Sequence, residues 1–344
     1  MSEKTKMKGW KKAVLIVLSV VCGLGFVLLG AIGYFTIPVA SYYQASQKAF
    51  MIPGIAEGAV AQGFDYDEES EKFFMTGYFS GKNPAASTVY IIDKKSGSSK
   101  AVRLYKEDDT KFTGHVGGIA INNDYVYVAS GTGVRVFSKQ EMLDAKNGGK
   151  VLCKGRFSTR VSDADEVSVS FVSVVDGKLI VGEFHDAKNG YTTPDSHKMT
   201  TPNGSRHSAL MVEFELNELS QYGIEAKPSK AYSIRDTVQG MTMYDGKFYL
   251  STSYGASFSQ IFEYDASKVT LIGDRTVLDC TIPVYALDKQ SLSYTYKLPP
   301  MAEEIVFVDG KLYTMCESAS NKYIFGKLIG GEWCYKTDLA KMKK

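Results

Sequence analysis

The chain has 344 residues, of which 44% are hydrophobic and 12% aromatic, and this composition excludes a disordered protein and allows one large domain or two small ones. The net charge of +2 hides an asymmetry, because residues 1–12 carry five lysines against a single glutamate. The rest of the chain is therefore weakly acidic, which excludes nucleic acid as an electrostatic partner.

An uncharged segment follows the basic start and runs from Ala13 to Phe35. A helix of that length spans about 34 Å at roughly 1.5 Å per residue, which is enough to cross a bilayer. A secretory signal peptide is the alternative, but its apolar region is shorter and it needs a small-residue cleavage site, for which residues 38–40 are a poor candidate. The lysines before the segment place the N-terminus in the cytoplasm by the positive-inside rule.

These features predict a single-pass protein of the cell membrane with four parts. Residues 1–12 form a cytoplasmic basic tail, 13–36 a transmembrane anchor (an uncleaved signal-anchor), 37–55 a linker and 56–344 an extracytoplasmic domain. Four cysteines belong to that domain, an even number that allows disulfides, with buried free thiols as the alternative. They are Cys153, Cys280, Cys316 and Cys334.

A sequence pattern typical of two paired strands recurs five times in the outer domain. Each copy consists of a small or polar opening, a β-rich run, a tight turn and a second run rich in Val, Leu, Phe and Tyr. The copies begin at Ala61, Gly117, Ser170, Gln239 and Glu303. Asp-Gly pairs at 176–177, 245–246 and 309–310 supply the positive φ angles of a two-residue type I′ hairpin, and Asn122-Asn123 is expected to do the same.

Further strands follow these pairs. A third strand is expected in stretches such as "STVYIIDKKSG" and "SQIFEYDAS", and a fourth in "KAVRLY", "KAYSI" and "SYTYKL". Four antiparallel strands repeated five times, with no convincing helix in the outer domain, predict an all-β fold, a β-propeller of five blades. Six blades are the alternative if residues 268–298 contain a degenerate blade. A β-sandwich explains the strand alternation but not the fivefold recurrence.

The propeller predicts where a site lies, because the start of the first strand and the end of the second emerge on one face of each blade, opposite the Asp-Gly hairpins. Polar residues at these positions are the candidate ligand-binding residues: Gln62, His115, Glu183, His185, Gln239, Tyr254, Glu303 and Glu317. The candidates for catalysis are Glu303, Glu317, Glu183, His115 and His185. The turn-rich segment 186–206 is expected on the same face, as a lid, a partner-binding loop or a disordered insertion.

Structural roles compete with these functional ones. The Gln-Gly pairs at 62–63 and 239–240 are also explained by backbone bonding and close strand approach between blades. Glu303 and Glu317 face a narrow channel, where a carboxylate needs a partner, water or a bound cation. A divalent cation such as calcium is therefore a candidate cofactor, although no local spacing of ligands supports it. The run "DYDEES" from Asp65 lacks the glycine of a calcium loop and indicates a solvated turn.

The stretch "QGMTMYDGKFYLSTSYGASFSQIFEYD" from Gln239 resembles one blade of the glutamine cyclotransferase propellers. It departs from that family at Leu250, where the family has a glutamate before Ser-Thr, and this puts cyclisation of N-terminal glutamine in doubt. The phrases "GHVGG", "GEFH", "VQGM" and "PPMAE" resemble exported bacterial propellers of uncharacterised function, in the style of the lactonase and strictosidine-synthase-like group. The resemblance implies a fold and a location, and no substrate.

Three functions fit these observations. The first is a membrane-anchored propeller that binds a small molecule, a sugar, a peptide or a protein partner at one face of its central channel. The second is a hydrolase or acyl transferase, lactonase-like or glutamine-cyclotransferase-like, in which a glutamate acts as base or cation ligand. The third is a structural scaffold of a membrane complex. No GxSxG, Walker, GxGxxG or HExxH motif favours the enzyme.

Overall fold

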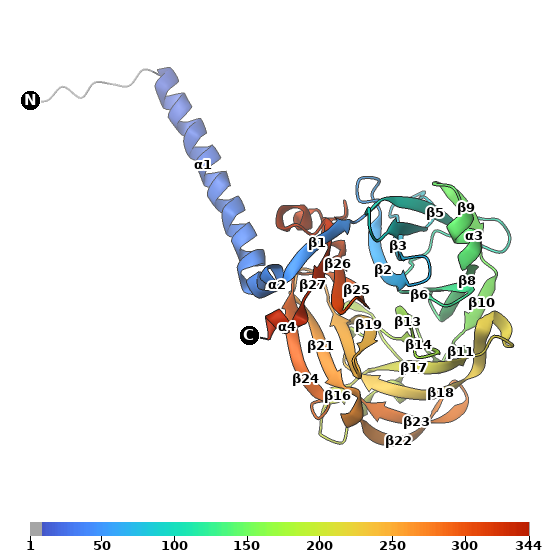
Figure 1. Cartoon of the computed structure of the whole chain (residues 1–344). Helices are drawn as coiled ribbons and strands as arrows, with labels where there is room; N and C mark the ends of the chain where they lie inside the picture. The colour runs from blue at the N-terminus through green and yellow to red at the C-terminus, as the bar shows by residue number, and fades with distance from the viewer. Residues whose placement is uncertain (1–8, 344) are drawn as a thin grey trace, which may run out of the picture.

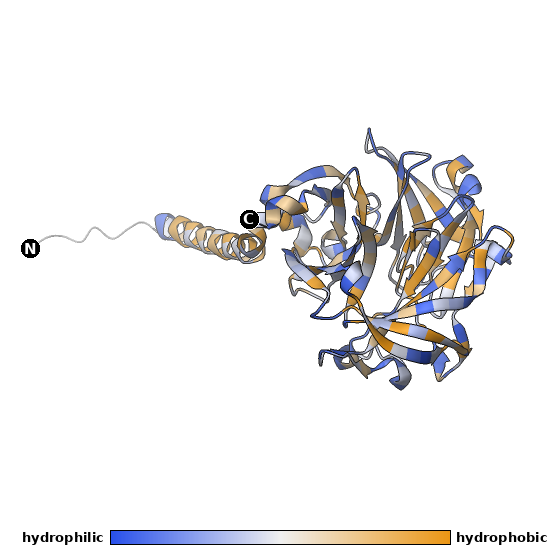
Figure 2. Ribbon diagram, turned by 60° about the horizontal axis from the view of Figure 1, so that its bottom comes forward, coloured by the Kyte–Doolittle hydropathy of each residue, from blue (hydrophilic) through white to orange (hydrophobic). Residues whose placement is uncertain are grey.

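A computed structural model describes residues 9–343, so the first part of the basic tail lies outside the described residues. The expected β-propeller is confirmed, with five blades arranged round a common centre and one long helix projecting from them (Figure 1). That helix, α1 (Gly9–Thr36), is long and apolar enough to cross a membrane. None of its residues is buried, and after Lys12 its surface is mostly apolar (Figure 2).

The segment after α1 is part of the propeller. Residues 37–55, expected to be a linker, contain η1 (Ile37–Val39), α2 (Ala40–Ala45) and β1 (Ser46–Met51). The strand β1 pairs antiparallel with the last strand of the chain, β27 (Trp333–Thr337), and so closes the ring. In α2, Tyr42 is buried and its hydroxyl lies 2.6 Å from Thr314 Oγ1. The N-terminal strand therefore completes the C-terminal blade.

Blades 1 and 2 each have four antiparallel strands. Blade 1 consists of β2 (Val60–Asp67), β3 (Lys72–Tyr78), β4 (Thr88–Asp93) and β5 (Ser99–Tyr105), with β9 (Gly149–Leu152) added in parallel to β5. Blade 2 consists of β6 (Ile119–Ile121), β7 (Tyr125–Ala129), β8 (Gly133–Ser138) and β10 (Gly155–Ser158). A short helix, α3 (Lys139–Asp144), follows β8, and a separate ribbon pairs β11 (Arg160–Ser162) with β12 (Asp165–Glu166).

The strands of blades 3 and 4 show that the propeller has five blades and not six. Blade 3 consists of β13 (Phe171–Val175), β14 (Lys178–Gly182), β17 (Ala209–Leu216) and β18 (Ile224–Ile234). Blade 4 consists of β19 (Val238–Tyr244), β20 (Lys247–Thr252), β21 (Ser259–Asp265) and β24 (Leu292–Leu298). The hairpin of β22 (Thr270–Val277) and β23 (Cys280–Ala286) is inserted within blade 4 but pairs with β18, at the outer edge of blade 3. Residues 268–298 therefore contain no sixth blade.

Blade 5 consists of β25 (Ala302–Val308), β26 (Lys311–Cys316), β27 and β1, and is followed by α4 (Leu339–Met342). Its free thiols Cys316 and Cys334 are buried on neighbouring strands. All five cysteines within residues 9–343 are free, so none of the disulfides that the sequence allows is formed.

The Asp-Gly hairpins have the expected geometry in three blades. Asp176, Asp245 and Asp309 have φ angles of 49°, 51° and 50°, and the glycine after each also has positive φ. The prediction for Asn122-Asn123 is wrong, because neither residue has positive φ. There the chain forms a longer connection in which Asn122 N donates to Tyr125 O at 2.9 Å. In these three hairpins glycine relieves the strain of the second position, whereas the turn between β22 and β23 has positive φ at Leu278 and Asp279 without a glycine.

A buried glutamate joins the blades at the centre. Glu304 of β25 accepts backbone hydrogen bonds from Phe64 at 2.7 Å, Ile119 at 2.9 Å and Val172 at 3.3 Å, which belong to blades 1, 2 and 3. A cavity of about 300 Å³ extends from this carboxyl group toward the hairpin face, and the innermost strands of all five blades line it. Glu304 therefore crosses the centre of the propeller and ties blade 5 to blades 1, 2 and 3.

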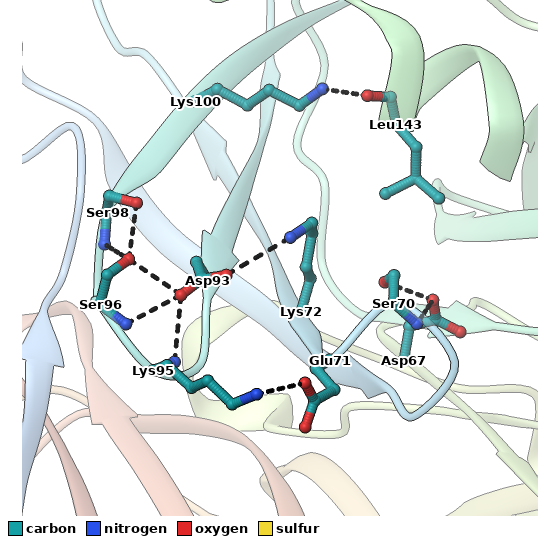
Figure 3. A network of polar contacts seen from close by, with 10 residues as sticks. All are labelled: Asp67, Ser70, Glu71, Lys72, Asp93, Lys95, Ser96, Ser98, Lys100 and Leu143. Atoms are coloured by element: carbon teal, nitrogen blue, oxygen red, sulfur yellow. Dashed lines mark hydrogen bonds and ion pairs between the residues drawn. The ribbon is translucent and has the colours of Figure 1, made fainter.

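The hairpin face of blade 1 is held by turn-specific polar contacts (Figure 3). Asp93 accepts from Ser96 N at 2.8 Å and Lys95 N at 3.1 Å, and Lys95 pairs with Glu71 at 2.9 Å. The run from Asp65, expected to be a solvated turn, is solvated only in part, because Asp65 and Asp67 belong to β2 and Asp67 is buried. The carboxylate of Asp67 caps the turn that follows by accepting from Ser70 N at 3.1 Å. These contacts explain the polar turn residues of this face without a ligand.

Candidate functional site

The candidate residues lie where the innermost strands begin. In blades 1, 4 and 5 the pairing of the first two strands shifts register at that point, between Ala61 and Phe64, between Val238 and Gly240, and between Ala302 and Ile305. Such β-bulges re-aim side chains and are frequent next to functional sites. The candidates Gln62, Gln239 and Glu303 lie inside these bulges, together with Gly63 and Glu304.

Four of the predicted residues come together at the mouth of the channel. The channel-mouth cluster contains Gln62, Tyr78, His115, Glu303, Glu317 and Lys322. Gln62 Nε2 donates to Glu317 Oε2 at 3.0 Å and so connects blade 1 to blade 5. The rings of Tyr78 and His115 lie 4.8 Å apart, and Lys322 Nζ donates to the Tyr78 hydroxyl at 2.9 Å. The cluster thus forms from residues up to 260 positions apart in the chain, from Gln62 to Lys322.

The two site glutamates are coupled carboxyl groups. Glu303 is 3% exposed, and burial, followed by the Glu317 and Glu304 carboxylates, raises its pKa well above the ordinary range. Glu317 is half-buried, and desolvation raises its pKa to about 7 even though Lys322, Tyr323 and Gln62 act to lower it. Two carboxyl groups that cannot both ionise easily will hold a proton between them near neutral pH.

The basic groups at the rim differ in their protonation. Desolvation by the surrounding atoms, followed by the Lys322 ammonium, lowers the pKa of His115 to about 4, although part of the side chain is open to solvent. His115 is therefore neutral at pH 7 and offers one donor and one acceptor nitrogen. Lys322 is exposed and carries the positive charge of the rim.

One atom of the site lacks a partner. Glu303 Oε1 is buried and has no hydrogen bond to any group of residues 9–343. Among the same residues no group of three or more His, Cys, Asp or Glu side chains is arranged to hold a metal ion. The arrangement can donate and accept hydrogen bonds and transfer protons through Glu303 and Glu317.

Glu183 and His185 belong to a different network. Glu183 is fully buried, accepts from Leu210 N at 2.9 Å and lies 2.9 Å from His197 Nδ1. His185 Nδ1 lies 2.9 Å from Thr193 Oγ1. These contacts fix the segment 186–206, which contains η2 (Ala187–Asn189), η3 (Asp195–His197) and the paired strands β15 (Met199–Thr200) and β16 (Arg206–His207). The long segment is an ordered loop, and these two candidates hold it in place.

Tyr254 and Gln239 lie apart from the hydrogen bonds of the channel-mouth cluster. Tyr254 is 41% exposed and, with Tyr191 at 52% and the ring of Phe184, forms an aromatic patch with centroid distances of 5.2 to 6.3 Å. Gln239 is half-buried in the bulge of β19. Because Tyr254 follows the end of β20, this patch lies on the same face as the channel mouth.

Lys322, Tyr323 and His197 were not expected from the sequence. All three lie in irregular connections, where neither strand periodicity nor a turn motif indicates which way a side chain points. The only signal was length, since 317–332 and 186–206 are the long connections of this face.

Comparison with known proteins identifies no family for this chain, and the solved structures that it resembles do so only weakly. No model of a known protein family matches the chain, and no curated protein does. Among solved structures, glutaminyl cyclase from Myxococcus xanthus is 10% identical, with a TM-score of 0.41 over 85% of this chain and 94% of that one. A GH43_1 enzyme from Xanthomonas citri is 11% identical, with a TM-score of 0.43 over 87% and 92%. The same enzyme in complex with xylose has a TM-score of 0.42 at 11% identity, over 86% and 90%.

Proposed function

We propose that this protein is a membrane-anchored propeller that binds a small polar ligand, a sugar or a short peptide, at the mouth of its channel. The observation that carries the proposal is the buried oxygen Glu303 Oε1, which has no partner within residues 9–343 and lies in a cluster of polar groups that runs from buried Gln62 to exposed His115 and Lys322. A buried polar atom without a partner costs free energy, and a ligand N–H or O–H would remove that cost.

The rim of the cluster suits a ligand with several hydroxyl or amide groups. Gln62, Tyr78, neutral His115 and Lys322 offer donors and acceptors of different geometry around the two carboxyl groups. The exposed rings of Tyr191 and Tyr254 on the same face provide apolar surfaces with a polar tip. A sugar ring or a peptide can use both kinds of surface, whereas a purely apolar ligand would leave the carboxyl groups unsatisfied.

The anchor is proposed from α1. Its apolar surface is exposed all round, and a helix of this kind lowers its free energy by entering lipid. The lysines at its N-terminal side favour a cytoplasmic N-terminus and a propeller outside the cell, by the positive-inside rule.

A hydrolase or acyl transferase is the second candidate, and the titration of Glu317 favours it. A carboxyl group with a pKa of about 7 can act as acid and base in one reaction cycle at neutral pH. Burial, followed by the Glu317 and Glu304 carboxylates, raises the pKa of Glu303 as well, which favours its protonated form as a hydrogen-bond donor.

The full chain in detergent or nanodiscs tests both candidates. Melting curves are recorded with a panel of wall-derived oligosaccharides and short peptides, and one class of these probes should raise the melting temperature. At a probe concentration 100 times its dissociation constant, the free energy of unfolding should increase by about 2.7 kcal/mol. Glu303→Gln should abolish that shift, and the exposed carboxyl variant Glu218→Gln should keep it. Turnover of chromogenic glycosides or esters that is lost in Glu317→Gln, while binding persists, would support the enzyme. No shift with any probe and no turnover would contradict both candidates.

A further inference from the structure

The end of α1 packs on loops that belong to the site face. The ring of Phe35 stacks on Phe325 of η7 (Phe325–Ile329) with a centroid distance of 5.2 Å and an interplanar angle of 25°. Phe35 and Tyr34 also contact Phe258, in the loop between β20 and β21, at 6.4 and 6.1 Å. Figure 1 shows α1 leaving the rim of the propeller beside β1 of blade 5. The helix is thus attached at the rim where these two loops lie.

The loop between β26 and β27, residues 317–332, exposes large apolar side chains next to that attachment. Ile324 is 61% exposed and Leu328 50%. Ile324 also has a φ of 51°, in the left-handed region that β-branched residues avoid. At the end of the helix Tyr34 is 66% exposed and Ile37 74%. Water is a poor environment for this group of side chains, and strain held at an exposed isoleucine points to a function.

The same region carries positive charge. Lys322 and Lys327 of this loop are exposed, and Lys297 lies over the ring of Phe258 at 4.1 Å. Within residues 9–343 none of these three lysines forms an ion pair; Lys322 and Lys327 donate to Tyr78 and Asn321 instead. Apolar side chains flanked by unpaired lysines suit a bilayer surface with anionic headgroups. The apolar side chains enter the interface, and the lysines bind the negatively charged headgroups.

We propose that loop 317–332 lies on the lipid bilayer, with Ile324 and Leu328 in the interface and lysines at the headgroups. The inference rests on the proposed anchor, because α1 brings the loop to the membrane. Continuity argues for lipid as the occupant: the exposed surface of α1 continues through Tyr34 and Ile37 to the loop through the Phe35–Phe325 contact.

The position of loop 317–332 also places the channel mouth relative to the membrane. Loop 317–332 also supplies Glu317 and Lys322 of the channel-mouth cluster. The mouth therefore opens beside the bilayer surface.

Depth-dependent fluorescence quenching tests the contact in the full chain in nanodiscs with anionic lipid. Cys22→Ser and Cys280→Ser remove the accessible thiols, since Cys153, Cys316 and Cys334 are buried. An environment-sensitive dye is then attached at Ile324→Cys, with Phe26→Cys as the probe of the anchor. Leu219→Cys is the aqueous control, because Leu219 is 95% exposed and follows β17 on the hairpin face.

Doxyl lipids should quench the dye at positions 26 and 324 and leave it unquenched at 219. Quenching at 26 with an aqueous spectrum at 324 would overturn the loop contact and leave the anchor intact. Aqueous spectra at both positions would overturn the anchor and the inference together. A blue shift at 324 without lipid quenching would show a protein partner or second copy and would also overturn the lipid contact. Unchanged melting curves of the labelled chains verify that they are folded.

Discussion

Gln62 in the bulge of β2 donates its side-chain amide to Glu317, 3.0 Å away and 255 residues later in the chain. The contact joins the first and last blades at the mouth of the channel. It also gives a partner to one oxygen of a carboxyl group whose pKa is raised to about 7. The candidate site therefore contributes a direct bond between the two blades that lie at the ends of the chain.

The Glu317 carboxyl should make the propeller less stable as pH rises from about 4.5 to 7. Over this window the folded protein holds a proton that the unfolded chain, with an ordinary glutamate pKa, has released, so unfolding is favoured as pH rises. Glu317→Gln keeps an acceptor for Gln62 and should raise stability at pH 7.5 by an amount on the order of 2 kcal/mol, with little change at pH 4. Urea unfolding at the two pH values measures the difference.

Asp65 should give a second pH dependence of stability, which does not depend on Glu317. Burial raises its pKa to about 7 as well, so a pH dependence of the same sign should persist in Glu317→Gln, with a smaller amplitude. A variant whose stability falls between pH 4 and 7.5 as steeply as that of the parent chain would contradict the assignment of the pKa to Glu317.

Glu304 should be a structural residue, in contrast to its neighbour Glu303. Its two oxygens accept three backbone N–H groups from three blades, and Glu304→Gln would turn an amide donor toward at least one of them. We expect a loss of about 2–4 kcal/mol in the free energy of unfolding. Glu218→Gln, on the exposed side of the loop after β17, should change stability by less than about 0.5 kcal/mol. Equal stabilities for the two variants would show that the central bonds do not hold the blades.

Substitutions at two glycines should show the separate costs of backbone strain in a turn and of close packing between blades. Gly246 has a φ of 68° and no atom within 4 Å of an added Cβ, so Gly246→Val should cost roughly 1–2 kcal/mol from the backbone conformation alone. At Gly118 an added Cβ would lie 2.4 Å from Val172 N and 2.7 Å from Glu304 Oε1, so Gly118→Ala should cost about 3 kcal/mol or more. Thermal unfolding of both variants compares them, and the opposite order would refute the close approach of blades 2 and 3.

His197 should matter for loop 186–206 and not for the channel mouth. His197→Ala removes the partner of buried Glu183 and leaves that carboxyl group half-satisfied. We expect faster proteolysis within 186–206 and faster hydrogen exchange there, with the ligand response of the channel-mouth cluster unchanged. Loss of that response in a folded His197→Ala chain would place Glu183 and His185 back in the ligand site.

The sequence predicted the blades better than it predicted the site. Turn chemistry is local, so Asp-Gly pairs and strand alternation located the hairpins and the face on which first strands begin. The bulges that aim Gln62 and Glu303 depend on the register between strands, which no single stretch of sequence determines. Lys322 and His197 lie in irregular loops, and the pairing of β23 with β18 depends on where an inserted hairpin folds back. These features follow from tertiary packing.

The propeller should need the residues from Ile37 onward to fold. A chain that starts at Ile37 keeps α2 and β1, whereas one that starts at Pro53, near the end of the segment expected to be a linker, lacks both. The shorter chain loses the buried ring of Phe50, which packs on Phe64 and Phe73 at 6.1 and 5.3 Å, and leaves β27 as an open edge. We expect the 37–344 chain to unfold cooperatively and the 53–344 chain to aggregate. Phe50→Ala in the longer chain should cost about 3–5 kcal/mol, because it empties the same position without removing the strand. If the 53–344 chain melts within a few degrees of the 37–344 chain, β1 does not close the propeller.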